Sequence, residues 1–222
     1  MKKFGAVVLA GGRGERFGGD KSRALLDGLP LWRYPVDRCM EIKDCREIII
    51  VGVGADDPFA LDAVFDDGVG LKRLVFVEST GFGVRCRDME VGLKEVISSR
   101  VVILESARPL VTCEQISRVA HSGHTCASFG MVNVDTVMLD DGGIETWDPG
   151  ELVLLQAPQA FNTRLLRGAV GKHDGLLWSC EVCLMEWVYG VKPFIFVGGV
   201  NLWKVTYPYD LRFLEVIKSR GD

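Results

Sequence analysis

The chain has 222 residues, with 26 Lys and Arg against 30 Asp and Glu, and a net charge of −4 at pH 7. This length suits one α/β domain with a substantial core, so we expect residues 1–222 to form a single domain. The acidic balance argues against general binding to nucleic acid or to an anionic membrane, and no apolar run approaches the ~20 residues that a membrane helix needs.

The first predicted element is a buried strand at residues 5–10, which runs into a loop rich in glycine and basic residues. Glycines occupy positions 11, 12, 14, 18 and 19, and Arg13, Arg16 and Lys21 stand among them. Glycines let backbone N–H groups approach a ligand closely, and guanidinium and ammonium groups donate to phosphate oxygens. The loop therefore predicts a binding site for a nucleoside triphosphate.

Two common phosphate-binding loops do not match this segment. The dinucleotide fingerprint G-x-G-x-x-G requires its third glycine where the chain has Phe17. The Walker loop G-x-x-x-x-G-K-[ST] requires a lysine directly after the glycine, but Asp20 separates Gly19 from Lys21. The segment L-A-G-G-x-G-x-R-F-G-G-D-K instead resembles the signature of sugar-nucleotide-type nucleotidyltransferases, in which this loop holds the triphosphate of the incoming nucleotide.

Strands and helices alternate through the first half of the chain. Strands are predicted at residues 46–53, 73–77 and 100–104, and helices at residues 31–42, 59–65 and 85–97. Such alternation predicts a Rossmann-like α/β fold, a doubly wound and mostly parallel sheet with right-handed crossovers. Ligands of such sheets bind beyond the carboxyl ends of the strands. We therefore expect the glycine loop, residues 80–85 and residues 105–109 to meet there.

After His124 the pattern becomes antiparallel. Residues 127–138 and 151–155 resemble strands with turn residues at 140–143 between them, which predicts a protruding β-arm at about 130–156. The remaining predicted elements are helices at residues 163–170, 179–188 and 208–218 and a strand at residues 193–197. Pro208 and Asp210 suit the first turn of the last helix.

The cysteines and the N-terminus both indicate a cytoplasmic protein. The seven cysteines are odd in number and scattered among apolar residues, which suits free thiols in a reducing compartment. Cys180 and Cys183 form a C-x-x-C motif, but no second pair of ligands accompanies it, so it does not predict zinc. Two lysines precede the first apolar run, yet glycines and arginines replace the cleavage site of a signal peptide.

Four further segments match one family in the same order. They are residues 106–109 (S-A-R-P, resembling D-A-A-R-P), Asp135 with Thr136 in the predicted arm, residues 156–161 (Q-A-P-Q-A-F, resembling Q-T-P-Q-x-F) and residues 201–211 (resembling N-x-K-x-T-x-x-D-L). Together with the glycine loop, these segments resemble the 2-C-methyl-D-erythritol 4-phosphate cytidylyltransferase family over nearly the whole chain. Pentitol-phosphate cytidylyltransferases share the same scaffold.

The resemblance implies a fold of the nucleotide-diphospho-sugar transferase type, a homodimer formed through the arm, and a reaction that depends on Mg²⁺. A phosphate oxygen of a small alcohol phosphate would attack the α-phosphate of CTP and release pyrophosphate. In the family the acceptor is 2-C-methyl-D-erythritol 4-phosphate, an intermediate of non-mevalonate isoprenoid biosynthesis. Because a phosphate nucleophile needs no general base at neutral pH, the protein's part would be positioning and charge neutralisation.

The resemblance also implies roles for individual residues. Arg16, Lys21 and Lys204 would be the catalytic cations, and Glu105 would bind Mg²⁺. The residues implied for the nucleotide are Ala10, Gly11, Gly12, Arg13, Gly14, Gly81, Arg85, Asp88 and Ser106. The residues implied for the acceptor are Asp135, Thr136, Ala157 and Ser179.

Two arginines have open roles. Arg23 stands seven residues after Arg16, where the family places its loop lysine, whereas Lys21 fits the shorter spacing of molybdopterin guanylyltransferases. We favour Lys21, with Arg23 as the substitute. Arg108 either takes part in the site or holds loop carbonyls at the end of its strand.

Several positions depart from the family's pattern. They are Glu105 for aspartate, Asp88 for a serine near the nucleobase, Pro149 for an arm arginine that holds the acceptor phosphate, Ala157 for threonine, Ser179 for threonine and Cys180 for aspartate. The acceptor-side residues change most, so either the acceptor differs or other cations such as Arg164 or Lys172 bind its phosphate. Two alternatives remain: another nucleotidyltransferase of this fold, either a pentitol-phosphate cytidylyltransferase or an enzyme like molybdopterin guanylyltransferase, and a nucleotide-binding homologue without turnover.

Overall fold

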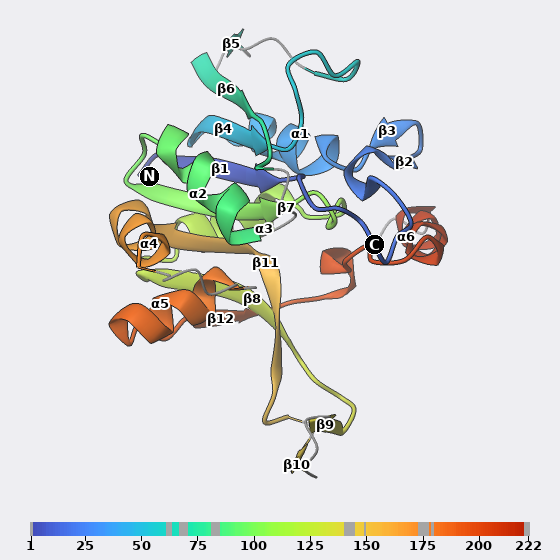
Figure 1. Cartoon of the computed structure of the whole chain (residues 1–222), viewed down its shortest axis with the longest axis vertical. Coiled ribbons are helices and arrows are strands. Elements are labelled where there is room, and N and C mark those ends of the chain that lie inside the picture. The colour runs from blue at the N-terminus through green and yellow to red at the C-terminus, as the bar shows by residue number, and fades with distance from the viewer. Residues whose placement is uncertain are drawn as a thin grey trace.

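The computed structural model describes residues 2–60, 64–66, 71–80, 85–139, 145–148, 150–172, 178 and 180–219. Within these residues, eight strands form one sheet in the order β12-β8-β11-β7-β1-β4-β6-β5 (Figure 1). The strands are β1 (Phe4–Leu9), β4 (Cys45–Val51), β5 (Val64–Asp66), β6 (Leu71–Val77), β7 (Arg100–Glu105), β8 (Cys126–Val132), β11 (Val153–Asn162) and β12 (Phe194–Val197).

One half of this sheet is parallel and the other half is mixed. Strands β7, β1, β4 and β6 run parallel to one another, as β12 does to β8. In contrast, β11 is antiparallel to both β7 and β8, and β5 is antiparallel to β6. The sequences of β1 (FGAVVL) and β4 (CREIIIV) are apolar almost throughout, as expected where helices cover both faces. The predicted Rossmann-like, doubly wound α/β fold is confirmed.

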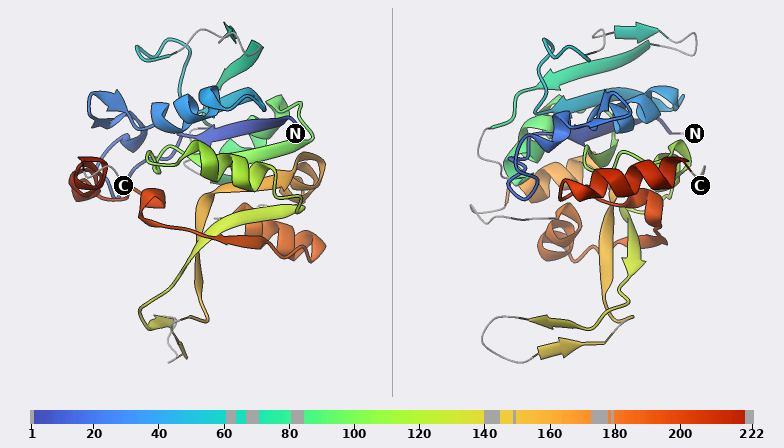
Figure 2. Two further views of the ribbon diagram at one scale, coloured as in Figure 1. Left: turned by 180° about the vertical axis from the view of Figure 1, so that it is seen from behind. Right: turned by 90° about the vertical axis from the view of Figure 1, so that its right-hand side faces the viewer.

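Helices cover both faces of the sheet (Figure 2). The helices are α1 (Arg33–Glu41), α2 (Arg85–Glu95), α3 (Cys113–Ala120), α4 (Thr163–Val170), α5 (Glu181–Tyr189) and α6 (Tyr209–Ser219). On one face, α1 and α3 cover a buried cluster that includes Trp32 and Ile116. On the other face, α2, α4 and α5 cover a second cluster, to which they contribute Met89, Leu166 and Met185. None of the described helices is long and apolar enough to cross a membrane.

The last helix packs against a small hairpin rather than against the main sheet. This hairpin consists of β2 (Leu25–Leu26) and β3 (Leu29–Pro30). Leu214 of α6 shares a buried cluster with Leu26 and Leu31, so the C-terminal helix and the segment after the glycine loop are held together. The loop before α6 is thereby placed beside the carboxyl end of the sheet.

A β-arm projects from the sheet at the predicted position, where β8 and β11 continue beyond it (Figure 1). Its end carries β9 (Val137–Leu139) paired with β10 (Glu145–Trp147). The strand predicted at 127–138 is interrupted, because Asn133 turns its side-chain amide to donate to the backbone carbonyl of Asp135. The predicted turn at residues 140–143 lies outside the described residues.

The helix predicted at residues 59–65 is wrong. Phe59 and Ala60 are not helical, and Val64–Asp66 forms the edge strand β5. The segment FALDAVF is short and mixes apolar with polar residues, so its periodicity is compatible with either element. Pairing with the edge of β6 decides in favour of a strand, because that edge offers unpaired N–H and C=O groups.

Candidate nucleotide-binding site

A pocket of about 140 Å³ lies at the carboxyl ends of β1 and β7. Its walls include the backbone of the glycine loop and the side chains of Lys21, Arg85, Asp88, Glu105 and Lys204. These residues come from four separate segments of the chain. The glycine loop and the segment after β7 therefore meet at the edge where the alternating pattern predicts a ligand site.

Glycine is required in the loop because the backbone turns back on itself. Gly14 has φ +64, and a Cβ there would lie 1.8 Å from the carbonyl oxygen of Gly19. The N–H groups of Phe17, Gly18 and Gly19 all donate to the carbonyl of Gly14. Gly12 is exposed, and a Cβ there would meet nothing within 4 Å. The backbone of this loop is thus accessible to a ligand.

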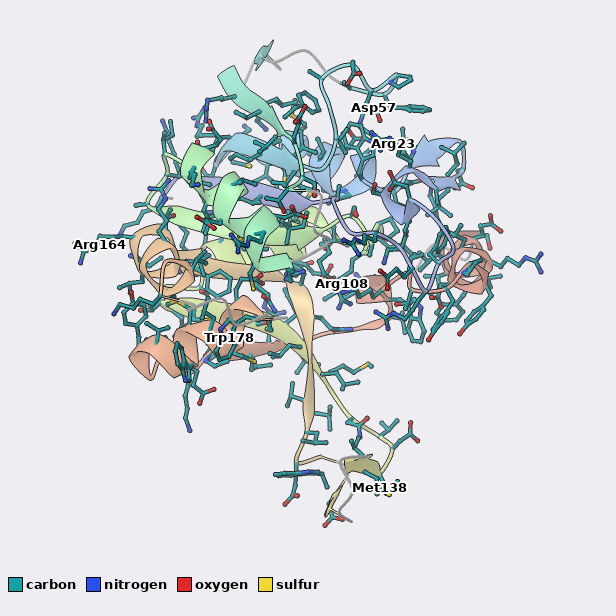
Figure 3. The ribbon with its side chains drawn as sticks, in the orientation of Figure 1. Arg23, Asp57, Arg108, Met138, Arg164 and Trp178 are labelled. Carbon is teal, nitrogen blue, oxygen red and sulfur yellow. The ribbon has the colours of Figure 1, made fainter. Side chains whose placement is uncertain are left out.

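A 3₁₀ turn at Lys21–Arg23 separates the two candidate loop cations. Asp20 caps this turn by accepting from the backbone N–H of Ser22 at 3.0 Å. Lys21 then lines the pocket, whereas Arg23 is half-exposed and pairs with Asp20 at 2.6 Å and Asp57 at 3.1 Å (Figure 3). The turn therefore directs Lys21, and not Arg23, toward the site.

The other loop arginines point to solvent. Arg13 is exposed and lies 3.7 Å from Glu15. Arg16 is exposed as well and does not line the pocket, but it is near enough to influence Lys21 electrostatically. Both arginines therefore lie on the exposed part of the loop, outside the pocket lining.

Glu105, the last residue of β7, is held by three cations. Its Oε1 accepts from Arg85 Nη1 at 2.5 Å and from Lys204 Nζ at 3.1 Å, and its Oε2 accepts from Arg108 Nε at 2.9 Å. Burial opposes ionisation, but the charges of Arg85, Lys204 and Arg108 outweigh it and hold the pKa of Glu105 well below its usual range. Glu105 is therefore an ionised carboxylate at every physiological pH.

Arg85 links this carboxylate to a second one that the sequence did not reveal. Its Nε donates to Glu181 Oε1 at 2.8 Å, and its Nη2 donates to Oε2 at 2.9 Å, while Nη1 reaches Glu105. Glu181 is only 3% exposed. Burial alone would lower the pKa of Arg85, but Glu181 and Glu105 together raise it above its ordinary value. Glu181 thus fixes the orientation of a guanidinium that lines the pocket.

Arg108 and the segment before α6 place Lys204 in the site. Arg108 Nη1 donates to the carbonyl of Leu202, and the N–H of Val205 donates to the carbonyl of Ala107 at 2.8 Å. Asp210 accepts from the backbone N–H groups of Thr206 and Tyr207 at 2.7 and 2.8 Å. Lys204 lies between these two anchors, so its ammonium reaches Glu105 at the pocket wall.

Glu105 has room for one further bond. An ionised carboxylate offers about four lone-pair positions, and Arg85, Lys204 and Arg108 use three of them. Mg²⁺ commonly takes only one or two carboxylates from the protein and the rest of its ligands from phosphates and water. Among the described residues, no group of three His, Cys, Asp or Glu side chains could hold a metal. The donor set therefore fits Mg²⁺ only in company with a polyphosphate.

Of the residues implied for the acceptor, Asp135, Thr136 and Ala157 are described by the structure, and these three do not line the pocket of the same chain. Asp135 and Thr136 are exposed on the arm, which ends far from Arg108, as the position of Met138 shows (Figure 3). Ala157 is buried within β11. Gly81, Pro149 and Ser179 lie outside the described residues.

The two alternative acceptor cations lie on α4 or at its end, outside the pocket lining. Arg164 is exposed and points outward from α4 (Figure 3), and Lys172 lies over the ring of Tyr189 at 5.3 Å. Among the predicted nucleotide residues, Ala10, Ser106 and Asp88 all line the pocket together with Gly11, Gly12 and Gly14.

Nucleotide binding should take up a proton at Lys21. Burial, with repulsion from Lys204 and Arg16, lowers the pKa of Lys21 below its ordinary value. A triphosphate favours the charged ammonium and raises that pKa, so affinity should fall as the pH rises between the free and the bound pKa. Calorimetry of CTP binding at alkaline pH, in buffers of different ionisation enthalpy, measures this uptake. Lys21→Arg should abolish it, since a guanidinium stays protonated; unchanged uptake in this variant would place the proton elsewhere.

Comparison with known proteins finds one family. The model of the family described as 2-C-methyl-D-erythritol 4-phosphate cytidylyltransferase matches residues 4–220. The protein of that name from Syntrophus aciditrophicus is 30% identical over 233 residues, which cover 99% of this chain and 97% of that one. The protein of that name from Clostridium beijerinckii is 28% identical over 223 residues, covering 95% and 96%.

Solved structures agree in fold. The crystal structure of 2-C-methyl-D-erythritol 4-phosphate cytidylyltransferase from Thermus thermophilus matches with a TM-score of 0.76 and covers 99% of this chain and 100% of that chain. The sequence identity is 22%, so this likeness concerns the fold alone.

Proposed function

Because the chain belongs to the 2-C-methyl-D-erythritol 4-phosphate cytidylyltransferase family, we propose that it transfers CMP from CTP to 2-C-methyl-D-erythritol 4-phosphate and releases pyrophosphate. This is the reaction that the resemblance implies for non-mevalonate isoprenoid biosynthesis. The observation that supports it best is the pocket beyond β1 and β7, where Lys21, Lys204 and Arg85 line the wall beside an open glycine backbone. Such a surface is complementary to a polyphosphate.

The side chains would act by holding charge in place. Lys21 and Lys204 would donate to the oxygens of the α-phosphate that gains negative charge as the acceptor oxygen attacks. Arg16, on the exposed loop, would neutralise the outer phosphates. The attacking phosphate oxygen is already ionised at neutral pH, so no residue is needed to remove a proton from it. The geometry therefore calls for positioned cations and no general base.

Mg²⁺ is the proposed cofactor. Glu105 would hold it through the remaining lone pair of its carboxylate, and the triphosphate would supply further ligands. When bound, the ion would neutralise phosphate charge and orient the triphosphate. Arg108 and Arg85 would keep the Glu105 carboxylate in one orientation for this purpose.

A homodimer through the arm is the proposed assembly. The arm exposes large apolar side chains, namely Met131, Val132, Val134, Met138, Trp147, Val153 and Leu154. A second copy would cover them, and it would bring Asp135 and Thr136 toward a pocket that is not their own. We also propose that the 222 residues act as one nucleotidyltransferase domain in the cytoplasm.

The dimer gives a simple prediction for solution mass. The chain has a mass of 24.5 kDa, so light scattering should give about twice that value. Met138→Asp together with Trp147→Asp should shift the mass to that of a monomer, because two charges would enter an apolar contact. Ile97→Asp is the control, since Ile97 is an exposed apolar residue outside the arm. A monomeric wild type would refute the proposed assembly.

The proposed reaction is tested by pyrophosphate release with Mg²⁺ and CTP. The acceptors are 2-C-methyl-D-erythritol 4-phosphate and, in parallel, ribitol and glycerol phosphates. Turnover with the first acceptor supports the proposal. Turnover only with another acceptor would make the chain a cytidylyltransferase of different specificity. Binding of CTP without turnover on any acceptor would make it a nucleotide-binding homologue.

A further inference from the structure

Two cysteines stand one turn apart at the start of α5. Cys180 is the N-cap residue, with extended backbone angles of φ −149° and ψ 125°, and Cys183 lies in the first turn. Residues three positions apart at the start of a helix have Cα atoms about 5 Å apart, within the ~4.4–6.8 Å that a disulfide requires. The side chains of the two cysteines share a hydrogen bond, and both thiols are free. The backbone therefore holds two thiols at a separation that a disulfide can bridge.

Solvent reaches this pair of thiols, whereas it does not reach a second pair. Cys183 is exposed and Cys180 is half-buried, with its sulfur 3.9 Å from the amide nitrogen of Gln159. Cys39 and Cys45 also share a hydrogen bond between their side chains, but both are 0% exposed. An oxidant in solution can therefore meet the first pair in the folded protein, and the second pair is closed to it.

The residue that follows Cys180 connects this pair to the nucleotide pocket. Glu181 holds Arg85 through both of its carboxylate oxygens, at 2.8 and 2.9 Å. Arg85 in turn lines the pocket and donates to Glu105 there. A bidentate contact depends on the orientation of both groups, so a shift in the first turn of α5 would change the position of the guanidinium.

We propose that Cys180 and Cys183 form a reversible disulfide, and that this disulfide weakens nucleotide binding by moving Glu181 and with it Arg85. The effect on binding rests on the proposed function, because it requires that Arg85 contacts the nucleotide. The C-x-x-C motif is then a site of thiol oxidation. In a reducing compartment such a disulfide is transient and responds to the supply of oxidant.

The oxidant is a low-molecular-weight disulfide such as oxidised glutathione. One cysteine thiolate attacks a sulfur of that disulfide, forms a mixed disulfide and releases one small thiol. The second cysteine thiolate attacks the protein sulfur of the mixed disulfide, and the other small thiol leaves. Two electrons pass from the cysteine pair to the oxidant, and the two cysteine protons end on the released thiols. Burial, together with Cys180, raises the pKa of the Cys183 thiol to about 11, so the exchange should be slow at neutral pH.

Formation of the disulfide draws the start of α5 together. Hydrogen-bonded heavy atoms lie at least ~2.7 Å apart, whereas the sulfurs of a disulfide are ~2.05 Å apart, so the two sulfurs approach by roughly 1 Å. Because Cys180 is the N-cap and Glu181 is the first helical residue, this approach turns the backbone of Glu181. Arg85 then loses the alignment of a charge-assisted contact, and such contacts contribute about 10-fold or more. The oxidised protein should therefore bind CTP about 10-fold more weakly than the reduced protein.

The test treats the full chain with oxidised glutathione and follows it by mass spectrometry and by calorimetry with CTP. The wild type should lose the mass of two hydrogens, mapped to the peptide that contains residues 180–183, and its dissociation constant for CTP should rise about 10-fold. Dithiothreitol should restore both values. Because coupling between two equilibria is reciprocal, saturating CTP should lower the equilibrium constant for oxidation by the same factor.

Cys183→Ser and Cys113→Ser are a matched pair of variants. Each replaces a thiol in the first turn of a helix that is not fully buried, but only the first removes a member of the proposed disulfide. Cys183→Ser should bind CTP as the reduced wild type does and should keep that affinity after oxidation. Cys113→Ser should respond to oxidation as the wild type does. The reverse pattern would overturn the assignment of the pair.

Failure of this inference and failure of the proposed function give different results. A wild type that keeps all seven thiols after treatment overturns the inference, and so does a disulfide that leaves the affinity for CTP unchanged. In both cases the reduced protein still binds and turns over CTP, so the proposed function stands. A reduced wild type that binds no CTP contradicts the proposed function instead, and the effect of the disulfide on binding falls with it.

Discussion

Replacing Lys21 by methionine should lower kcat by about 10²–10³-fold without unfolding the protein. Lys21 lines the pocket and lies close to Lys204 and Glu105, where a positive charge would stabilise the reacting phosphate. Methionine keeps the length of the side chain and removes only its charge. Because burial and repulsion from Lys204 already lower the pKa of Lys21, the folded protein disfavours this charge. The thermal midpoint of the variant should therefore equal or exceed that of the wild type.

Arg23→Met is the control for Lys21→Met. Arg23 sits two positions away, but its guanidinium is half-exposed and pairs with Asp20 and Asp57 outside the pocket. Its removal should change kcat by less than about threefold and lower stability by about 1–3 kcal/mol, because the Asp57 side chain is only 2% exposed and loses a cationic partner. If instead Arg23→Met abolished turnover and Lys21→Met did not, the assignment of the loop cation would be reversed. Steady-state kinetics and thermal denaturation of both variants decide between them.

The parallel half of the fold follows from local sequence, and the mixed half does not. The runs that form β1 and β4 are apolar on both faces, which only a covered parallel strand requires. Strand β11 contains the segment Q-A-P-Q-A-F, which sequence reasoning treated as a motif rather than as a strand. Its insertion between β7 and β8 depends on pairing partners far away in the chain, and local periodicity carries no information about those partners.

The same distinction holds for the site: residues in recognisable local segments could be predicted, and a residue that depends on a distant partner could not. Lys21 stands in a recognisable loop, and Glu105 and Lys204 stand in segments that resemble a family, so all three were predicted before the structure placed them in one pocket. Glu181 was missed because its partner Arg85 is 96 residues away. One feature of the sequence could have indicated Glu181: it is a glutamate at the start of the apolar helix EVCLMEWVY. A glutamate buried with such a helix requires a cation as its partner.

Replacing Glu181 by glutamine should be the most destabilising single change at the site, at about 3–5 kcal/mol. Glu181 is 3% exposed and binds Arg85 through both of its oxygens. Glutamine keeps one acceptor but leaves the guanidinium without the charge that compensates its burial. Arg85 would then rely on Glu105 alone, and that carboxylate is already shared with Arg108 and Lys204. Urea denaturation measures the loss, and nucleotide affinity should fall with it.

Glu95→Gln separates this effect from the removal of any carboxylate. Glu95 pairs with Arg73 at 2.9 Å, but both side chains are 41% exposed, so its loss should cost less than about 1 kcal/mol. A similar small cost for Glu181→Gln would mean that water or Glu105 compensates the charge of Arg85, and the Glu181–Arg85 pair would then contribute little to stability. The other outcome is a large cost of Glu181→Gln in the wild type and little further cost in a protein that already carries Arg85→Met. That result would assign the free energy to the Glu181–Arg85 pair, because the partner charge is then absent as well. In that case Glu181 holds Arg85 in the pocket at the expense of two buried charges, and the arrangement is explained by the nucleotide site that Arg85 lines.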